Sequence, residues 1–144
     1  MAGKSIDKGV QERKIRVLLC VSEIDGHDRG LKYIAKKLAE AGMEVVYISY
    51  KIIEEIVDTA IQEDVDAIGI SSSTGGHLGV ISDLMALLKA KGVDNKVVIA
   101  GGIIPTVDIP ILQEMGVGRV FGPGTHGHEV VHYILENVAK KTIL

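Results

Sequence analysis

Five short apolar runs alternate with segments of helical periodicity along this 144-residue chain, and this alternation constrains the fold more than any other feature. The runs, most of them rich in β-branched residues, are Ile15–Val21, Glu44–Ser49, Asp66–Ile70, Lys96–Ala100 and Arg119–Phe121. After each run, apolar residues recur three or four positions apart, in Leu31–Ala39, Ile52–Ile61, His77–Lys91, Asp108–Met115 and Gly127–Lys140. Five successive βα units predict an α/β domain with a parallel sheet and helices on both faces.

The number of units also predicts the strand order. For five strands the common doubly wound arrangement is the flavodoxin-like (Rossmann-like) order 2-1-3-4-5. Ligands of such folds bind outside the carboxyl ends of the strands, at the switch point between the first and third strands. A candidate site is therefore expected on the loops Ser22–Gly30, Ser71–Gly76, Gly101–Pro105 and Gly122–Gly127.

The composition agrees with a buried parallel sheet in one domain. Hydrophobic residues make up 47% of the chain, yet it has one Phe, four Tyr and no Trp, so the core must be built from Val, Ile, Leu and Ala. We expect a polar N-terminal segment, residues 1–14, followed by a single domain over residues 15–144. Cys20 is the sole cysteine, which excludes an intrachain disulfide, and its apolar neighbours favour a buried position.

Charge and hydropathy argue against two classes of partner. The net charge is −3 with acids and bases interspersed, so no basic stripe follows a phosphate backbone and nucleic acid is not expected. No run approaches the ~20 apolar residues of a transmembrane helix. The N-terminus has no apolar stretch of the signal-peptide type. We therefore expect no membrane partner and a cytoplasmic protein.

The first of the four loops carries an Asp and a His at a spacing that suits metal ligation. Asp25 and His27 are two residues apart, so the carboxylate can accept the proton of one ring nitrogen and leave the other nitrogen free as a ligand. Gly26 and Gly30 allow a large group to approach the backbone. A His in a polar loop is more often simply solvated, so this spacing alone identifies no site.

The other three loops are rich in glycine and hydroxyl side chains. The stretch Ser71–Gly76 leads into a helix and suits a polar ligand or an anion, or is an ordinary helix cap. Gly101-Gly102 follows the fourth strand, and Gly122–Thr125 follows the fifth. Together these loops predict a long, shallow groove. The dinucleotide fingerprint G-x-G-x-x-G is absent after the first strand, and so is the phosphate-loop motif.

Taken together, the loops resemble the D-x-H-x-x-G … S-x-L … G-G signature of cobalamin-binding domains. The matching positions are Asp25, His27 and Gly30, then Ser71, then Gly101-Gly102. The resemblance covers nearly the whole chain after the polar N-terminus. It is nearest to the methylmalonyl-CoA mutase branch, which includes C-terminal domains and separate small subunits of acyl-CoA mutases.

The resemblance implies roles for individual residues. His27 is expected to be the lower ligand to the cobalt of base-off cobalamin, and Asp25 to hold its other ring nitrogen; these two are the candidate catalytic residues. The displaced nucleotide tail is expected to run past the third-strand and fourth-strand loops toward the fifth. The implied cofactor-binding residues are Gly26, His27, Asp28, Arg29, Gly30, Ile34, Ser71, Ser73, Gly75, Gly101, Gly102, Phe121, Gly122 and Thr125.

The resemblance also implies a function: the cobalamin-binding subunit of an adenosylcobalamin-dependent acyl-CoA mutase, an isomerase that rearranges a carbon skeleton. A separate large subunit with a (β/α)₈ barrel, a fold of ~250 residues, would bind the acyl-CoA, and this chain alone would catalyse nothing. One alternative is a non-catalytic corrinoid carrier or sensor, although carriers usually have a helical domain ahead of the cobalamin domain. Another is a flavodoxin-like receiver or flavin module, whose acidic cluster or stacking aromatics the sequence does not show.

Several positions depart from the family pattern, among them Ser73 and Val21. Ser73 stands where the signature has Leu, which makes one wall of the tail pocket polar. Val21 stands where acyl-CoA mutases usually carry a Lys that pairs with the Asp of the signature. Without that Lys, the pKa of Asp25 is expected to be less depressed.

The four remaining histidines have less defined roles. His77 opens a helix and is expected either to touch the cofactor or to cover the pocket. His128 and His132 stand four residues apart, which is a metal-ligand spacing, but no Cys or carboxylate completes an obvious set. With His126, they are more simply expected at the rim of the groove or in solvent.

Overall fold

Residues 13–143 are described by the computed structural model, and their strands form one parallel sheet in the order β2-β1-β3-β4-β5. The strands are β1 (Arg16–Ser22), β2 (Glu44–Tyr50), β3 (Ala67–Ser72), β4 (Val97–Gly102) and β5 (Arg119–Phe121). The helices are α1 (Arg29–Glu40), α2 (Ile53–Gln62), α3 (His77–Ala90), the 3₁₀ turn η3 (Thr106–Asp108), α4 (Ile109–Met115) and α5 (Gly127–Ile143). The predicted flavodoxin-like order is confirmed. Residues 1–12 of the expected polar segment 1–14 lie outside the described residues.

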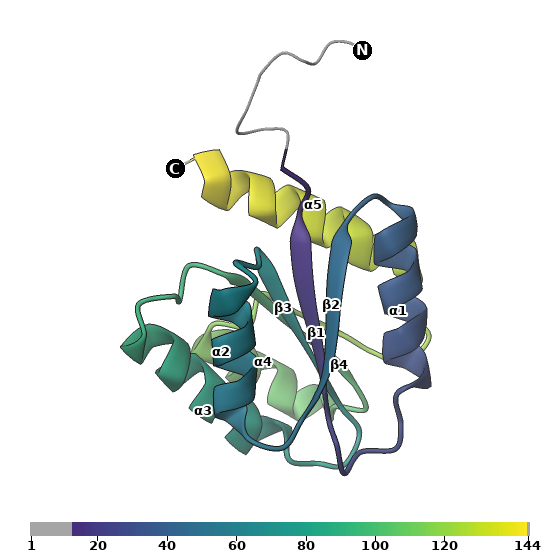
Figure 1. Ribbon diagram of the computed structural model, residues 1–144. Helices are drawn as coiled ribbons and strands as arrows, with labels where there is room; N and C mark the ends of the chain where they lie inside the picture. Colours follow the sequence, from purple (N-terminus) through teal and green to yellow (C-terminus); the bar gives the residue numbers. More distant parts are fainter. Residues whose placement is uncertain (1–12, 144) are drawn as a thin grey trace.

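Two helical layers cover the sheet, α1 with α5 on one face and α2, α3 and α4 on the other (Figure 1). Because side chains alternate along a strand, β1 contributes to both cores. Leu18 and Cys20 pack against the α2–α4 layer, whereas Val17, Leu19 and Val21 pack toward α1 and α5. All five side chains are at most 4% exposed, which explains why this central strand reads as one continuous apolar run.

The strands extend further toward their carboxyl ends than the apolar pattern predicted. β3 ends at Ser72 and β4 at Gly102, each two residues beyond the predicted end, because the ladder continues through the pairs Ser71–Gly101 and Ser72–Gly102. Backbone pairing needs no apolar side chains. Residues that were expected in loops are therefore held in the sheet.

Two helices are also longer than the sequence pattern predicted. α1 begins at Arg29, two residues before the first periodic apolar residue, and α5 continues to Ile143, beyond the predicted end at Lys140. Polar residues extend a helix without contributing to the apolar stripe that sequence periodicity detects.

Gly102 holds the ends of β3 and β4 together. Its φ of +110° is one that L side chains rarely adopt, and a Cβ there would overlap the carbonyl group of Ser72. The N–H of the next residue, Ile103, donates to the same Ser72 carbonyl oxygen at 2.9 Å. The segments after β3 and β4 therefore leave the sheet in direct contact.

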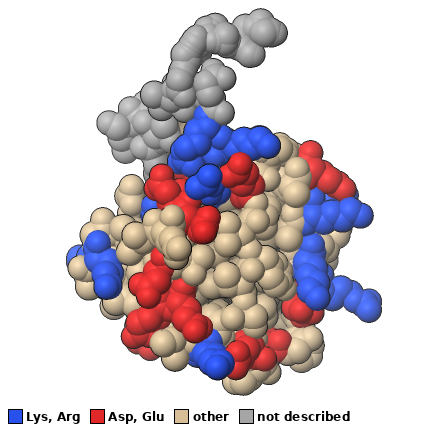
Figure 2. Space-filling view, in the orientation of Figure 1, with Lys and Arg blue, Asp and Glu red and all other residues tan. Residues whose placement is uncertain are grey.

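Charge of both signs is spread over the visible surface (Figure 2). Lys32 and Lys36 are exposed on α1, while Glu54, Glu55 and Asp58 are exposed on α2, and uncharged surface lies between the two helices. Within the part of the chain that the structure describes, no helix is long and apolar enough to cross a membrane.

We expect Gly102→Ala to lower the free energy of unfolding by about 2–3 kcal/mol, because Ala must adopt an unfavourable φ and displace the Ser72 carbonyl. Urea unfolding followed by circular dichroism measures the change. Gly79→Ala is the matched control: Gly79 lies in α3 at an ordinary φ with open space around it, so this variant should be about 0.5–1 kcal/mol more stable. Equal stability of the two variants would contradict the assignment.

Candidate functional site

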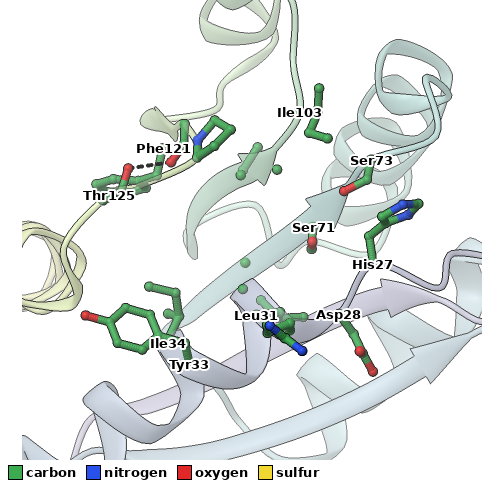
Figure 3. A pocket seen from close by; sticks show the side chains of 18 of the residues that line it. His27, Asp28, Leu31, Tyr33, Ile34, Ser71, Ser73, Ile103, Phe121 and Thr125 are labelled. Carbon is green, nitrogen blue, oxygen red and sulfur yellow. Dashed lines mark hydrogen bonds between the residues drawn. The ribbon is translucent and has the colours of Figure 1, made fainter.

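A cavity of about 1020 Å³ opens at the carboxyl edge of the sheet, on the face that α1 and α5 cover. Each of the four predicted loops contributes residues to its lining, and His27 and Thr125 come from loops far apart in the sequence (Figure 3). The cavity lies beside the junction of β1 and β3, the switch point at which successive connections leave the sheet on opposite faces. The cavity therefore lies at the expected position of the site.

Two glycines keep the floor of the cavity at the level of the sheet backbone. Gly69 of β3 and Gly101 of β4 both line it. A Cβ on Gly69 would come within 2.8 Å of Leu19 Cδ2, and one on Gly101 within 3.2 Å of the Phe121 carbonyl oxygen. Side chains at either position would require neighbouring groups to shift and would take up space in the cavity. The floor of the cavity is therefore open because Gly69 and Gly101 have no side chains.

Tyr33, Phe121 and Thr125 line the cavity on the side away from His27 (Figure 3). Tyr33 of α1 accepts a hydrogen bond at its hydroxyl from the N–H of Gly127, at 3.2 Å, which joins the start of α5 to α1. Phe121 packs edge-on against Tyr133, with ring centroids 6.0 Å apart. The hydroxyl of Thr125 donates to the carbonyl oxygen of Gly122 at 2.6 Å and closes the turn after β5 (Figure 3).

His27 lies at the open end of the cavity and is held by the carboxylate of Asp25. Its ring nitrogen Nδ1 is 3.1 Å from Asp25 Oδ1, and the same oxygen accepts the His27 backbone N–H at 2.9 Å. The imidazole is 68% exposed, whereas the Asp25 side chain is 1% exposed. Because a carboxylate accepts, the neutral imidazole carries its proton on Nδ1, and in this tautomer Nε2 has a free lone pair. Within the described residues, no hydrogen bond reaches Nε2.

Asp25 is the best-connected polar side chain of the site. Its second oxygen, Oδ2, accepts the backbone N–H of Ser73 at 3.0 Å, so this carboxylate joins the β1–α1 loop to the β3–α3 loop. Burial raises the pKa of Asp25, but the N–H groups of His27 and Ser73 and the His27 ring together outweigh it, and the pKa is lowered. Val21, at the position of the family's Lys, is buried in the core. Backbone donors thus stabilise the charge where the Lys is missing.

The structure brings almost the whole predicted set together. Every predicted cofactor-binding residue except Gly75 lines the cavity. Gly75 lies in the exposed β3–α3 loop, and its role stays a prediction. The additional lining residues that sequence reasoning did not single out are Leu19, Leu31, Tyr33, Gly69, Ile70, Ile99, Ala100, Ile103, Pro123, Gly124 and Val130. One signal was available: a glycine inside a buried strand, such as Gly69, marks a close approach of ligand or backbone.

The other histidines divide between the rim and the interior. His126 lines the cavity, as expected, and stacks on His128 with ring centroids 5.6 Å apart. His132 pairs with Glu136 at 4.0 Å. Among the described residues, no group of three or more His, Cys, Asp or Glu could hold a metal ion. His77 does not line the cavity; it is buried and bonded to Asp108.

We expect Asp25→Asn to lower the free energy of unfolding at pH 7 by about 1–3 kcal/mol, because an amide NH₂ would face a backbone N–H in a buried position. The lowered pKa means that ionised Asp25 stabilises the fold above the unfolded value of about 4, and this stabilisation is lost as the pH falls through the folded value. The stability difference from wild type should therefore shrink below about pH 4. Asp83→Asn, on the exposed face of α3, is the control; a difference that stays constant with pH would contradict the assignment.

Solved structures share the fold over most of the chain. A cobalamin-binding protein from Desulfitobacterium hafniense DCB-2 matches with a TM-score of 0.74 at 22% identity, over 87% of this chain and 60% of that one. A signal receiver domain from Vibrio parahaemolyticus matches with a TM-score of 0.68 at 11% identity, over 91% of this chain and 95% of that one. At such identities the likeness shows the fold alone, and two different functions share it.

Sequence relatives are more specific. The 2-hydroxyisobutanoyl-CoA mutase small subunit of Aquincola tertiaricarbonis is 39% identical over 92% of this chain and 98% of its own length. The pivalyl-CoA mutase small subunit of Xanthobacter autotrophicus is 42% identical over 85% and 82%. The methylmalonyl-CoA mutase of Cereibacter sphaeroides is 41% identical, but the chain spans 18% of that protein. The family model of the B12 binding domain matches residues 15–132, and the chain therefore belongs to the B12-binding domain family.

Proposed function

We propose that this chain is the cobalamin-binding small subunit of an adenosylcobalamin-dependent acyl-CoA mutase, with His27 as the lower ligand to cobalt. The observation that carries the proposal is the His27–Asp25 pair at the mouth of the cavity. The Nδ1 of His27 is held by the buried Asp25 carboxylate, and the Nε2 of this tautomer has a free lone pair on a largely exposed ring. This is the arrangement in which a His ligates a metal, with its second nitrogen fixed by a carboxylate.

The residues present fit the cofactor in two respects. Cobalt already coordinated by a corrin ring needs one protein nitrogen rather than a complete ligand set, and the site offers one imidazole. The nucleotide tail needs a long space beside that ligand, and the cavity extends from His27 along the glycine floor to Phe121 and Thr125. We assign the tail to this space, where Ser71 and Ser73 supply hydroxyl groups and Ile34 and Phe121 supply apolar contacts.

Adenosylcobalamin, when bound, supplies the radical chemistry of a carbon-skeleton rearrangement. The work assigned to this chain is binding and orientation: Asp25 fixes the tautomer of His27, and the cavity would hold the nucleotide tail. We infer that the acyl-CoA binds on another domain or subunit, because the cavity of the one α/β domain in residues 13–143 is assigned to the cofactor. We assign that role to a large subunit with a (β/α)₈ barrel, because two relatives aligned over most of their length are mutase small subunits.

Exposed apolar side chains surround the mouth of the cavity and suit that partner. Ile24 after β1 is 84% exposed, and Ile103 and Val107 after β4 are 61% and 79% exposed. Ile24 and Ile103 lie in loops and Val107 lies in η3, all at the carboxyl edge of the sheet, the edge that carries His27. Apolar groups concentrated at one edge are typical of an interaction site. A non-catalytic carrier or sensor remains the alternative, and no contact of the site favours it.

We expect the ¹⁵N-labelled chain, loaded with unlabelled cobalamin and reduced to Co(II), to show electron paramagnetic resonance splitting by one ¹⁵N nucleus. Labelling distinguishes a protein imidazole from the cofactor's own base, because only the protein nitrogen changes its nuclear spin. His27→Ala should lose this splitting, and His132→Ala, which removes an exposed imidazole away from the cavity, should retain it. Splitting by an unlabelled nitrogen in the wild type would exclude His27 as the ligand.

We expect Val107→Asp to weaken binding of the cognate large subunit at least tenfold, because a charge would be placed in an apolar contact. Cobalamin binding should be unchanged, since Val107 does not line the cavity. Ile61→Asp is the matched control: Ile61 is 45% exposed near the end of α2, at the opposite edge of the sheet. Isothermal calorimetry measures the binding of the large subunit by each variant, and reconstituted mutase activity provides a second measurement. A larger effect from Ile61→Asp would place the interface elsewhere.

A further inference from the structure

A buried His–Asp pair lies outside the cavity, at the same edge of the sheet. His77, the first residue of α3, has its Nε2 at 2.7 Å from Oδ2 of Asp108, the last residue of η3. The His77 side chain is 5% exposed and that of Asp108 18%. Within the described residues, the second ring nitrogen of His77, Nδ1, is buried with no hydrogen-bond partner. The N-cap residue of α3 is Gly76, which has no side chain to cap the helix.

Such a pair is a poor device for stability alone. Removing an imidazole and a carboxylate from water costs free energy that their mutual attraction does not always recover, and the buried Nδ1 adds to that cost. Well-packed apolar side chains could fill the same space with less penalty. A role in positioning accounts better for these two residues.

The pair holds together two loops that border the cavity. His77 ends the β3–α3 loop, and Asp108 lies at the end of the segment that follows β4. The other end of this junction is the bond from Ile103 N–H to the Ser72 carbonyl, at 2.9 Å. The β3–α3 loop is thus fixed at its start by Ser72 and at its end by His77, with only residues 73–76 between them.

The fixed loop carries the donor on which Asp25 depends. Ser73 follows Ser72 directly, and its N–H donates to Asp25 Oδ2 at 3.0 Å. Asp25 Oδ1 in turn faces His27 Nδ1 at 3.1 Å. A continuous set of contacts therefore leads from Asp108 through His77 and the loop to Ser73, Asp25 and His27.

We propose that His77 and Asp108 are a positioning pair, which holds the β3–α3 loop so that the Ser73 amide reaches Asp25 and thereby fixes the tautomer of His27. The consequence for cobalt ligation rests on the proposed function, but the positioning itself is a property of the chain without cofactor. It assigns a role to two residues that lie outside the cavity and that the metal-ligand signature does not include.

Nuclear magnetic resonance of the full chain without cobalamin tests the proposal. Hydrogen exchange of the Ser73 amide reports its bond to Asp25, and imidazole ¹⁵N shifts at an alkaline pH report which His27 nitrogen carries the proton. We expect His77→Leu to accelerate Ser73 exchange at least tenfold and to convert His27 from the Nδ1–H form to a mixture of tautomers. The amide of Ile70, inside β3, should keep its protection.

Two further variants separate positioning from general stability. His77→Gln retains a side-chain N–H for Asp108 and should restore both signals, even if its melting temperature is lower. Asp108→Ala removes the carboxylate, the more exposed of the two side chains, and should reproduce the effects of His77→Leu. His132→Leu is the control for loss of a histidine.

Folded His77→Leu and Asp108→Ala with unchanged Ser73 exchange and unchanged His27 tautomer would overturn the proposal, as would loss of folding in both, since the pair would then serve the fold alone. Neither outcome bears on cobalt ligation, because no cobalamin is present. Conversely, failure of the labelled-nitrogen experiment on His27 leaves the positioning result intact.

Discussion

The buried carboxylate of Asp25 is the interaction on which the site depends. It accepts two hydrogen bonds from the backbone N–H groups of His27 and Ser73 and one from the His27 ring. It therefore joins the β1–α1 loop to the β3–α3 loop. Backbone donors cannot be lost by side-chain rotation, so they define the position of the carboxylate closely. The same bonds lower its pKa despite burial and keep it an acceptor, which leaves His27 Nε2 free.

The cavity beside this pair exists because side chains are missing where the sheet would otherwise be covered. Gly69 and Gly101 stand at positions whose neighbours on the same strands are Ala67 and Ile99, both in the core formed with α1 and α5. This core is thus interrupted at Gly69 and Gly101, near the carboxyl ends of β3 and β4. The core between the sheet and helices α1 and α5 stabilises the domain. Where this core is interrupted, it leaves space for a ligand.

The fold alone does not indicate a function. Receiver domains and cobalamin-binding proteins share this arrangement of strands and helices at low identity. What distinguishes the chain is the content of the loops at one edge, together with apolar side chains such as Ile24 and Val107 that no described element covers. The alternation of strands and helices places the site, and the loop residues determine its chemistry.

From the sequence alone, periodicity indicated five βα units, and the common doubly wound order for five strands then predicted the sheet order and the edge that holds the candidate site. The resemblance to cobalamin-binding domains singled out His27 and Asp25, and their spacing of two residues allows the contact that the structure shows. Only the tertiary structure decided that Ser73 donates to Asp25, that Gly69 opens the floor, that His77 turns away from the cavity toward Asp108, and that Ser71 and Gly101 lie in strands. These are contacts between segments far apart in the chain, and they depend on how strands register and loops pack, which no local pattern of residues encodes.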